Sequence, residues 1–332
     1  MNGMYRTKKM RWVMFCLSFT ALLLLISADF ASSSESPYPS KTIVFCTHSN
    51  PGSGGDIVGR QLAEALKAQK INAVVENRPG GSGSINMAYT ASRPPDGYTL
   101  GISTASLIGA RYIANLPLSF RDFAPVAMLQ SEEFALVARA DAKWKTIDEL
   151  VQDMKANPGK IKLGGGYIGS LDSLIAFQLG KVAGFKPAYV PYNDGAELTT
   201  ALLGGHLSVA ITNPLESAPQ IQSGQIRMLA LAGEKRLEFF KDVPTMKERG
   251  YDVVQPIWRG VWAPKGTPDA ITNKAAEILK RAMQEEKFKK YMHDGMLREV
   301  FLGPADFFKA MEKQDSEVSQ LIKELGITPR KK

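Results

Sequence analysis

Cysteine and histidine are scarce in this chain of 332 residues, which contains two cysteines and three histidines. Cys16 lies in an N-terminal segment that we expect to be removed, so Cys46 would remain alone and no internal disulfide is predicted. The sequence has neither a His-Glu-x-x-His pattern nor a cysteine pair with the spacing of metal ligands. We therefore expect no metal site and no cofactor.

Long apolar runs are also absent, with one exception at the N-terminus. Trp12–Ala28 carries no charge, follows a basic segment at residues 6–11, and precedes small and polar residues at 29–36. This order is typical of a secretory signal peptide over residues 1–28, cleaved after Ala28 or Ala31. A retained membrane anchor is the alternative, although the run is short for a full span. The prediction is that the mature protein is exported from the cytoplasm.

A strong charge of one sign is missing once the leader is discounted. The full chain has a net charge of +8, and removal of four basic leader residues leaves 37 basic against 33 acidic residues, or +4. So small an excess does not indicate a nucleic-acid partner or a membrane surface.

Signatures of catalysis are missing as well. No G-x-S-x-G elbow accompanies the histidines, and no G-K-S/T follows the glycines at 52–55. Ile57 stands where a dinucleotide-binding G-x-G-x-x-G would need its last glycine. His48 is near the glycines, but a packing role is its simpler interpretation. We assign no catalytic residue, and two function classes stay open. The chain is either a binding protein or a secreted enzyme acting on an organic acid in its ligand-binding cleft.

The chain does contain a strand, a glycine-rich turn and a helix start in direct succession. Ile43–Cys46 is a short apolar run, Pro51–Gly55 forms the turn, and apolar residues recur at helical spacing after Asp56. Such a helix start aims backbone N–H groups and the positive end of the helix dipole at one point, which suits an anion. The alternative is a tight turn in which Asp56 merely caps its own helix.

Strands and helices alternate through most of the remaining sequence, which predicts an α/β fold with parallel sheets flanked by helices. Ligands in such sheets sit off the carboxyl ends of the strands. Glycine- and hydroxyl-rich loops are predicted at those ends four times, at Gly52–Asp56, Ser103–Ser106, Gly164–Ser170 and Tyr192–Gly195. The segment 123–129 contains Pro125 and is predicted to be an edge or broken strand. Two helices, at about 269–293 and 304–325, are expected to close the chain.

Several separated motifs coincide with one known family. In order, they are YPSKTI, PGSGGDIVGRQLAEAL, VVENRPGGSGSI, PPDGYTL, FAPVAML, TIDELVQDMKANPGKIKLGGG, GSLDSL, VPYNDGAE, ALLGGHLSVAITN, SGQIRMLAL, DVPTMKERGY and WRGVWAPKGTP. With these motifs the chain, from Tyr38 onward, resembles the periplasmic substrate-binding proteins of tripartite tricarboxylate transporters, the Bug family.

The resemblance implies a two-lobed venus-flytrap fold without catalysis, each lobe a mostly parallel sheet flanked by helices. It places residues 38–138 and 254–332 in lobe 1 and residues 139–253 in lobe 2. The lobes would close on a small carboxylate, and the loaded protein, expected to be a monomer, would dock on membrane permease subunits. A sensor kinase is a further possible client.

The resemblance also implies which residues bind the ligand. In lobe 1 they are Ser49, Asn50, Gly52, Ser53, Gly54, Gly55 and Asp56, followed by Thr104, Ala105 and Ser106. In lobe 2 they are Tyr167, Ile168, Gly169 and Ser170, then Tyr192, Asn193, Asp194 and Gly195, and finally Asn213. We expect recognition to be led by the backbone, with the N–H groups of Gly54 and Gly55 donating to a carboxylate.

Three positions depart from the family pattern. Ser173 stands where the family usually has His, Asn193-Asp194 stands where many members have Arg-Gly, and Asn213 is a neutral amide where many have Asp nearby. These departures concern the identity of the ligand rather than the fold.

Overall fold

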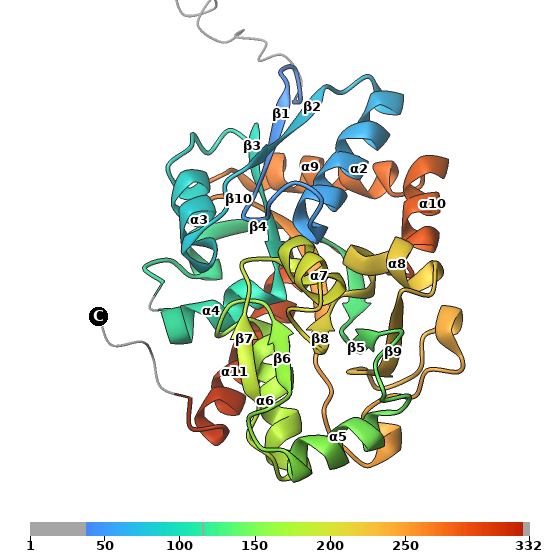
Figure 1. Cartoon of the computed structure of the whole chain (residues 1–332). Helices are drawn as coiled ribbons and strands as arrows, with labels where there is room; N and C mark the ends of the chain where they lie inside the picture. Colours follow the sequence, from blue (N-terminus) through green and yellow to red (C-terminus); the bar gives the residue numbers. More distant parts are fainter. Residues whose placement is uncertain (1–37, 115, 328–332) are drawn as a thin grey trace, which may run out of the picture. The chain divides into compact units, whose positions relative to one another are not determined.

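The computed structural model describes residues 38–114 and 116–327. The predicted signal peptide and both of its cleavage points lie outside the described residues. From Lys41 onward the described chain forms one compact unit built on two sheets (Figure 1). Within the described residues, no helix is both long enough and apolar enough to cross a bilayer.

The first sheet has six strands. Their order across the sheet is β11 (Arg298–Leu302), β4 (Phe123–Glu133), β10 (Pro256–Pro264), β3 (Thr99–Thr104), β1 (Ile43–Thr47) and β2 (Ala73–Asn77). β1 pairs in parallel with β2 and β3, as the alternating pattern predicts, because a helix crosses over between these strands. β10, β4 and β11 pair antiparallel, so the sheet is mixed.

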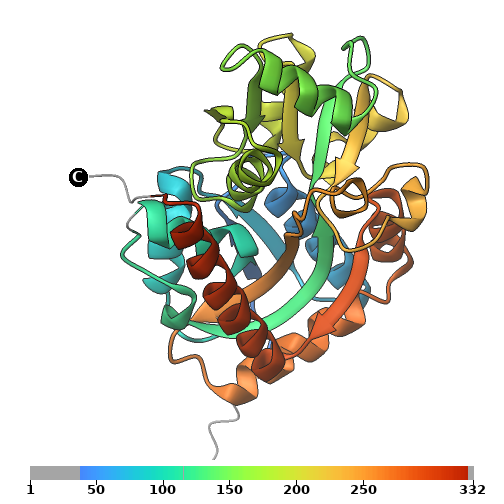
Figure 2. The same cartoon turned by 90° about the horizontal axis from the view of Figure 1, so that it is seen from below.

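Six helices accompany the first sheet. They are α2 (Gly54–Leu66), α3 (Ser84–Ala91), α4 (Ala105–Ala114), α9 (Asp269–Ala282), α10 (Glu286–Asp294) and α11 (Pro304–Glu324). Figure 2 shows α11 lying across one face of the sheet, where Phe307 stands edge-on to Trp258 with ring centroids 5.0 Å apart. The predicted helix at 269–293 is interrupted between α9 and α10, and the short strand β11 was not predicted.

The second sheet has five strands. Their order is β7 (Ala188–Pro191), β6 (Lys162–Gly165), β8 (Val209–Thr212), β5 (Ala135–Arg139) and β9 (Ile226–Leu231). β6 pairs in parallel with β7 and β8, whereas β5 pairs antiparallel with β8 and β9. The accompanying helices are α5 (Ile147–Ala156), α6 (Leu171–Ala183), α7 (Gly195–Leu203) and α8 (Ala218–Gln222), with the 3₁₀ turn η5 (Pro214–Ser217) before α8.

The chain passes from one sheet to the other at two places. Only Phe134 separates β4 of the first sheet from β5 of the second, and residues 232–255 lead back from β9 to β10. Because β5 belongs to the second sheet, we propose Phe134 in place of 138/139 as the first lobe boundary. We keep the return near 254 as proposed.

The strand that contains Pro125 is not broken, but its Pro125 end pairs with β10 alone and is an edge there, as expected. β4 runs without interruption over 11 residues between β10 and β11. β11 pairs with Ser131, Gln130 and Met128 only, so Pro125 lies outside that pairing. On the other side, the register with β10 shifts next to the Pro125–Trp262 pair. The missing N–H is therefore placed where the ladder is already irregular.

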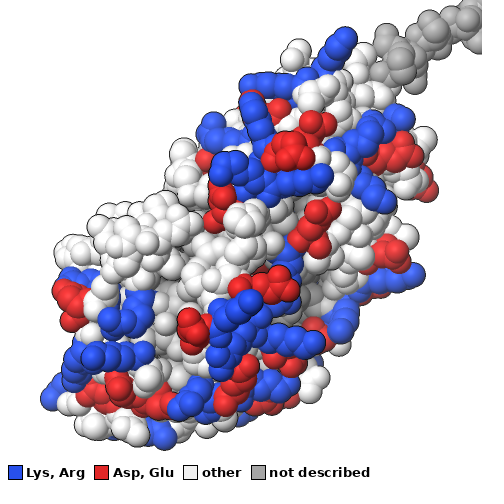
Figure 3. Space-filling model, turned by 90° about the vertical axis from the view of Figure 1, so that its right-hand side faces the viewer, with Lys and Arg blue, Asp and Glu red and all other residues white. Residues whose placement is uncertain are grey.

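Charged side chains of both signs are interspersed over the face drawn in Figure 3. That face has no broad field of one sign, which agrees with the small net charge expected for the mature chain.

Candidate functional site

A pocket of about 70 Å³ lies among loops of both sheets. The lining residues from the first sheet and its loops are His48, Ser49, Thr104, Ser106, Ile257 and Arg259. Those after the first crossing are Phe134, Gly166, Tyr167, Ser170, Asp172, Asn193, Asp194, Gly195, Leu198, Thr212, Asn213 and Glu216. One water needs roughly 10–15 Å³ by this measure, so the pocket suits a small polar guest rather than a large one.

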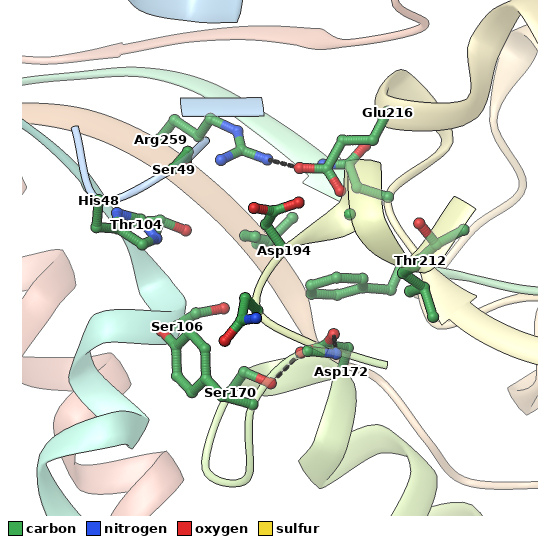
Figure 4. Close-up of a pocket in the computed structure, with 18 residues that line it drawn as sticks. His48, Ser49, Thr104, Ser106, Ser170, Asp172, Asp194, Thr212, Glu216 and Arg259 are labelled. Atoms are coloured by element: carbon green, nitrogen blue, oxygen red, sulfur yellow. Dashed lines mark hydrogen bonds and ion pairs between the residues drawn. The ribbon is translucent and has the colours of Figure 1, made fainter. Parts of the chain in front are cut away.

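One end of the pocket is formed by the Arg259 guanidinium and the Glu216 carboxyl group, with Glu132 behind them. Arg259 on β10 donates from Nε to Glu132 Oε1 at 2.8 Å, and its Nη2 lies 3.5 Å from Glu216 Oε1. Figure 4 shows Arg259 and Glu216 joined by this ion pair at one end of the pocket. Burial opposes the charge of Arg259, but the two carboxylates raise its pKa above the ordinary value. The guanidinium is thus charged and already paired within the protein.

Glu216 also occupies the donor that the sequence assigned to the ligand. The backbone N–H of Gly54, at the start of α2, donates to Glu216 Oε1 at 2.8 Å. Burial raises the pKa of Glu216 to about 7, although Arg259 and this N–H oppose the shift. The Gly54 N–H is therefore engaged by a protein carboxylate from the other sheet, and its contact with a ligand carboxylate stays a prediction.

In the loop after β6, backbone and side-chain donors are likewise bound by a carboxylate of the protein. Asp172, in the first turn of α6, accepts hydrogen bonds from the Gly166 N–H and the Ser170 hydroxyl. The Gly169 N–H donates to Ser173 Oγ at 2.9 Å. Ser173, which stands where the resemblance expects His, is fully buried and serves the loop instead of the pocket. Burial raises the pKa of Asp172.

Asp194 joins the loop after β7 to the first sheet. Its Oδ1 caps α7 by accepting from the N–H groups of Ala196 and Glu197 at 3.0 and 3.1 Å. Its other oxygen accepts a hydrogen bond from the Asn50 amide. Asn50 is thus a bridging residue beside the pocket, and together with Tyr192 it lines a neighbouring surface depression.

Asp56 has a structural role. Its Oδ2 accepts from the Gly52 N–H at 3.0 Å and from Arg60 Nε at 2.8 Å, while Oδ1 accepts from the Asn77 amide at 2.9 Å. Burial favours the neutral acid, but these three bonds together lower the pKa of Asp56. The carboxylate holds the glycine turn and the end of β2 together and does not line the pocket.

Several lining residues have buried polar atoms without a hydrogen-bond partner among the described residues. These atoms are His48 Nδ1, Thr104 Oγ1, Tyr167 Oη, Thr212 Oγ1 and Asn213 Nδ2. Buried polar groups in folded proteins are almost always paired with protein, water or ligand, so these five atoms are available to hydrogen-bond a polar guest in the pocket.

Asn213 shows most clearly what that guest must offer. Its Oδ1 accepts from the Leu215 N–H at 2.9 Å as the cap of η5, which fixes the orientation of the amide. The NH₂ group is left as a pure donor, and Asn213 is only 2% exposed. The guest must therefore present an acceptor here.

His48 offers a neutral ring. Burial, reinforced by the positive charge of Arg259, lowers its pKa to about 4. The imidazole is uncharged near neutral pH and can donate or accept one hydrogen bond. No group of three or more His, Cys, Asp or Glu side chains among the described residues has the geometry to hold a metal ion.

Nine of the predicted ligand-binding residues line the pocket, and the others lie behind it or beside it. The lining ones are Ser49, Thr104, Ser106, Tyr167, Ser170, Asn193, Asp194, Gly195 and Asn213. The non-lining ones are Asn50, Gly52, Ser53, Gly54, Gly55, Asp56, Ala105, Ile168, Gly169 and Tyr192. Most of the non-lining residues are glycines or residues at helix starts. They form the loops from which neighbouring side chains point into the pocket.

The residues that sequence reasoning missed are chiefly the charged ones. Asp172, Glu216 and Arg259 line the pocket, and Glu132 supports Arg259 from behind. A signal for Arg259 was available, since it is the one charged residue in the apolar run that becomes β10. Asp172 and Glu216 resemble ordinary acidic residues in a first helical turn, and nothing local distinguishes them.

Comparison with known proteins agrees with this architecture. Residues 58–327 match the model of the tripartite tricarboxylate transporter family receptor. The chain is 31% identical to the protein BugT of Bordetella pertussis over 81% of this chain and 86% of BugT. It is 29% identical to the UPF0065 protein in the gbd 5' region of Cupriavidus necator over 91% of this chain and 93% of that protein.

Solved structures give the same result. The structure of the periplasmic binding protein BugD superposes with a TM-score of 0.83 at 27% identity, covering 88% of this chain and 100% of BugD. The fold is thus that of two-lobed periplasmic binding proteins, as the sequence motifs predicted.

Proposed function

The chain belongs to the tripartite tricarboxylate transporter receptor family, a family of periplasmic substrate-binding receptors, and we propose that it captures a small organic carboxylate in the pocket between its two sheets. The N-terminal segment directs export to the periplasm. The loaded protein then docks on the permease subunits of a tripartite tricarboxylate-type transporter and releases the acid there.

The observation that carries this proposal is the set of unpaired polar groups around the pocket. Thr104, Thr212 and Asn213 are each at most 3% exposed, and each presents an unpaired polar atom to the pocket. A carboxylate has about four acceptor sites, so it can satisfy several of these groups at once. Recognition is led by side chains, in place of the backbone donors expected from the sequence.

The energetics are compatible with useful affinity. An unsatisfied buried polar group costs about 1–3 kcal/mol, which a bound carboxylate recovers at each group that it satisfies. Micromolar binding requires about 8 kcal/mol. Three or four such hydrogen bonds to a charged acceptor in a closed, water-excluded pocket supply this amount.

Calorimetric titration of the exported, processed protein tests the proposal, after unfolding and refolding to remove any copurified ligand. The panel consists of dicarboxylates, tricarboxylates, amino-substituted acids and aromatic acids. We expect at least one acid to bind with micromolar affinity or better and to be recovered unchanged. Failure of every acid to bind would refute the proposal, and chemical conversion of the bound acid would favour a secreted enzyme.

Docking is tested separately. The loaded protein should stimulate uptake of its acid into vesicles that contain the permease subunits, whereas the free acid alone should not be taken up. Equal uptake with and without the binding protein would contradict the delivery step and leave the binding step intact.

A further inference from the structure

We propose that the ligand of this pocket carries a protonated amine in addition to its carboxylate, as a small amino acid does, and that Asp172, Asp194 and Glu216 receive the amine. This inference rests on the proposed function, because it takes the same pocket and the same carboxylate and adds a second recognised group.

The charges that line the pocket do not suit a guest that is only an anion. Three carboxyl groups, those of Asp172, Asp194 and Glu216, face one guanidinium, that of Arg259. Figure 4 shows Asp194 between the Arg259–Glu216 end and the Ser170–Asp172 end. His48 adds no positive charge, since its pKa is about 4. Beside a dicarboxylate, these carboxyl groups would have to stay protonated or repel it, because Arg259 is the one lysine or arginine among the lining residues.

The guanidinium and the backbone N–H groups that could offset these negative charges already donate hydrogen bonds to carboxylates of the protein. Arg259 is held by Glu132 at 2.8 Å, and that carboxylate lies behind the pocket. The Gly54 N–H at the start of α2 is bound to Glu216, and the Gly166 N–H near the start of α6 is bound to Asp172. Neither loop offers these donors to a second anionic group.

The polar atoms without a hydrogen-bond partner indicate how many carboxylates of a ligand the pocket can bind. Thr104, Thr212 and Asn213 are nine-tenths or more buried, line the pocket and have no partner for their Oγ1 or Nδ2 atoms. Their neutral donors suit a single carboxylate. The three carboxyl groups then remain for a group of opposite charge, and an ammonium with three N–H donors matches them.

A cationic group would also resolve the energetic cost of these buried acids. Burial raises the pKa of both Asp172 and Glu216, which means that their charged forms are disfavoured in the empty pocket. An ammonium placed between them favours the charged forms and strengthens its own binding. The positive charge of the ligand and the negative charges of the carboxylates thus stabilise each other.

The test is calorimetric titration at pH 8 with sets of acids that differ in one substituent. Aspartate, malate and succinate carry an ammonium, a hydroxyl or a hydrogen at the same carbon, and glutamate, 2-hydroxyglutarate and glutarate form a second set. The inference predicts that the amino member of at least one set binds at least about tenfold more tightly than its two counterparts.

The outcomes separate the inference from the proposed function. If a hydroxy or unsubstituted acid binds as tightly as its amino counterpart or more tightly, the amine inference is overturned and the carboxylate proposal stands. If no carboxylate of any kind binds, the proposed function fails and this inference fails with it.

Variants give a second, independent test. Asp194→Asn keeps the cap of α7, because Asn is an equally good N-cap, and it removes one negative charge from the pocket together with the hydrogen bond accepted from Asn50. We expect it to lower the affinity for the amino acid at least about fivefold and to leave the affinity for the matched diacid unchanged or raised. Asp306→Asn, an exposed site in the first turn of α11, is the matched control and should change neither affinity. Equal loss for both ligands in Asp194→Asn would contradict the inference.

Discussion

The Glu216→Gln variant addresses the central contact of the pocket. Glutamine keeps an Oε1 acceptor for the Gly54 N–H, which donates to Glu216 at 2.8 Å, and it removes the titrating proton. The groups that face Glu216 are Arg259 on β10, Glu132 on β4, Asp172 on α6 and this backbone N–H. A difference between the variant and wild type in the pH dependence of stability is therefore attributed to titration of the Glu216 carboxyl group.

The sign and size follow from the shifted pKa. The pKa of Glu216 is about 7 in the folded chain and 4.5 in the reference state, so the folded state holds a proton that the unfolded state has lost between these values. Stability therefore decreases as pH rises from about 4.5 to 7, by about 3 kcal/mol for a shift of this size. Glutamine lacks this loss, so the variant should gain about 3 kcal/mol relative to wild type between pH 4 and pH 8.

The assay is thermal or urea unfolding of the ligand-free protein at pH 4, 6 and 8. For a chain of this length, about 3 kcal/mol corresponds to roughly 5 °C in Tm. Glu133→Gln is the matched control, because burial also raises the pKa of Glu133 to about 7, but Glu133 lies outside the pocket next to Arg298. Both variants should flatten the pH dependence, and only Glu216→Gln should alter ligand affinity. A stability difference between Glu216→Gln and wild type that does not change with pH would refute the reasoning.

Three further predictions concern the pocket and the core. Asn213→Asp keeps the oxygen that caps η5 but replaces the unpaired donor with a negative charge, so calorimetry should show at least about tenfold weaker carboxylate binding with Tm nearly unchanged; unchanged affinity would remove Asn213 from the site. An added Cβ at Gly54 would overlap the Arg259 guanidinium, so Gly54→Ala should cost about 1–3 kcal/mol in unfolding free energy. Gly303→Ala meets no atom within 4 Å and should cost only the roughly 0.5–1 kcal/mol lost when Ala replaces Gly at the N-cap of α11; a Gly303→Ala cost equal to or above that of Gly54→Ala would contradict the packing argument. Burial raises the pKa of the Cys46 thiol to about 11, so the folded protein should resist thiol reagents at pH 8 and react fully only after unfolding; rapid labelling of the native protein would contradict this.

Local sequence patterns were enough to predict the strand–turn–helix units. The units around Gly52–Asp56 and Gly164–Ser170 form as expected, because strand pattern, glycine turn and helix start act over a few residues. The pattern could not identify what the freed N–H groups bind. The partner of Gly54 is Glu216, which lies 162 positions along the chain, and no local rule connects the two.

The same limit explains the strand that was missed. Proline lacks a donor, which indicated an edge strand around Pro125, and that end of β4 does pair with β10 alone. The strand Arg298–Leu302 has no strong strand pattern and forms by pairing with β4. Long-range pairing overrides local preference in this second case.

Phe134 is the only residue between the last residue of β4 and the first residue of β5, and it also lines the pocket. Whatever occupies the cavity therefore contacts the shorter of the two connections between the sheets. One side chain is at once part of the chain crossing and part of the pocket wall, so a substitution at this position changes both together.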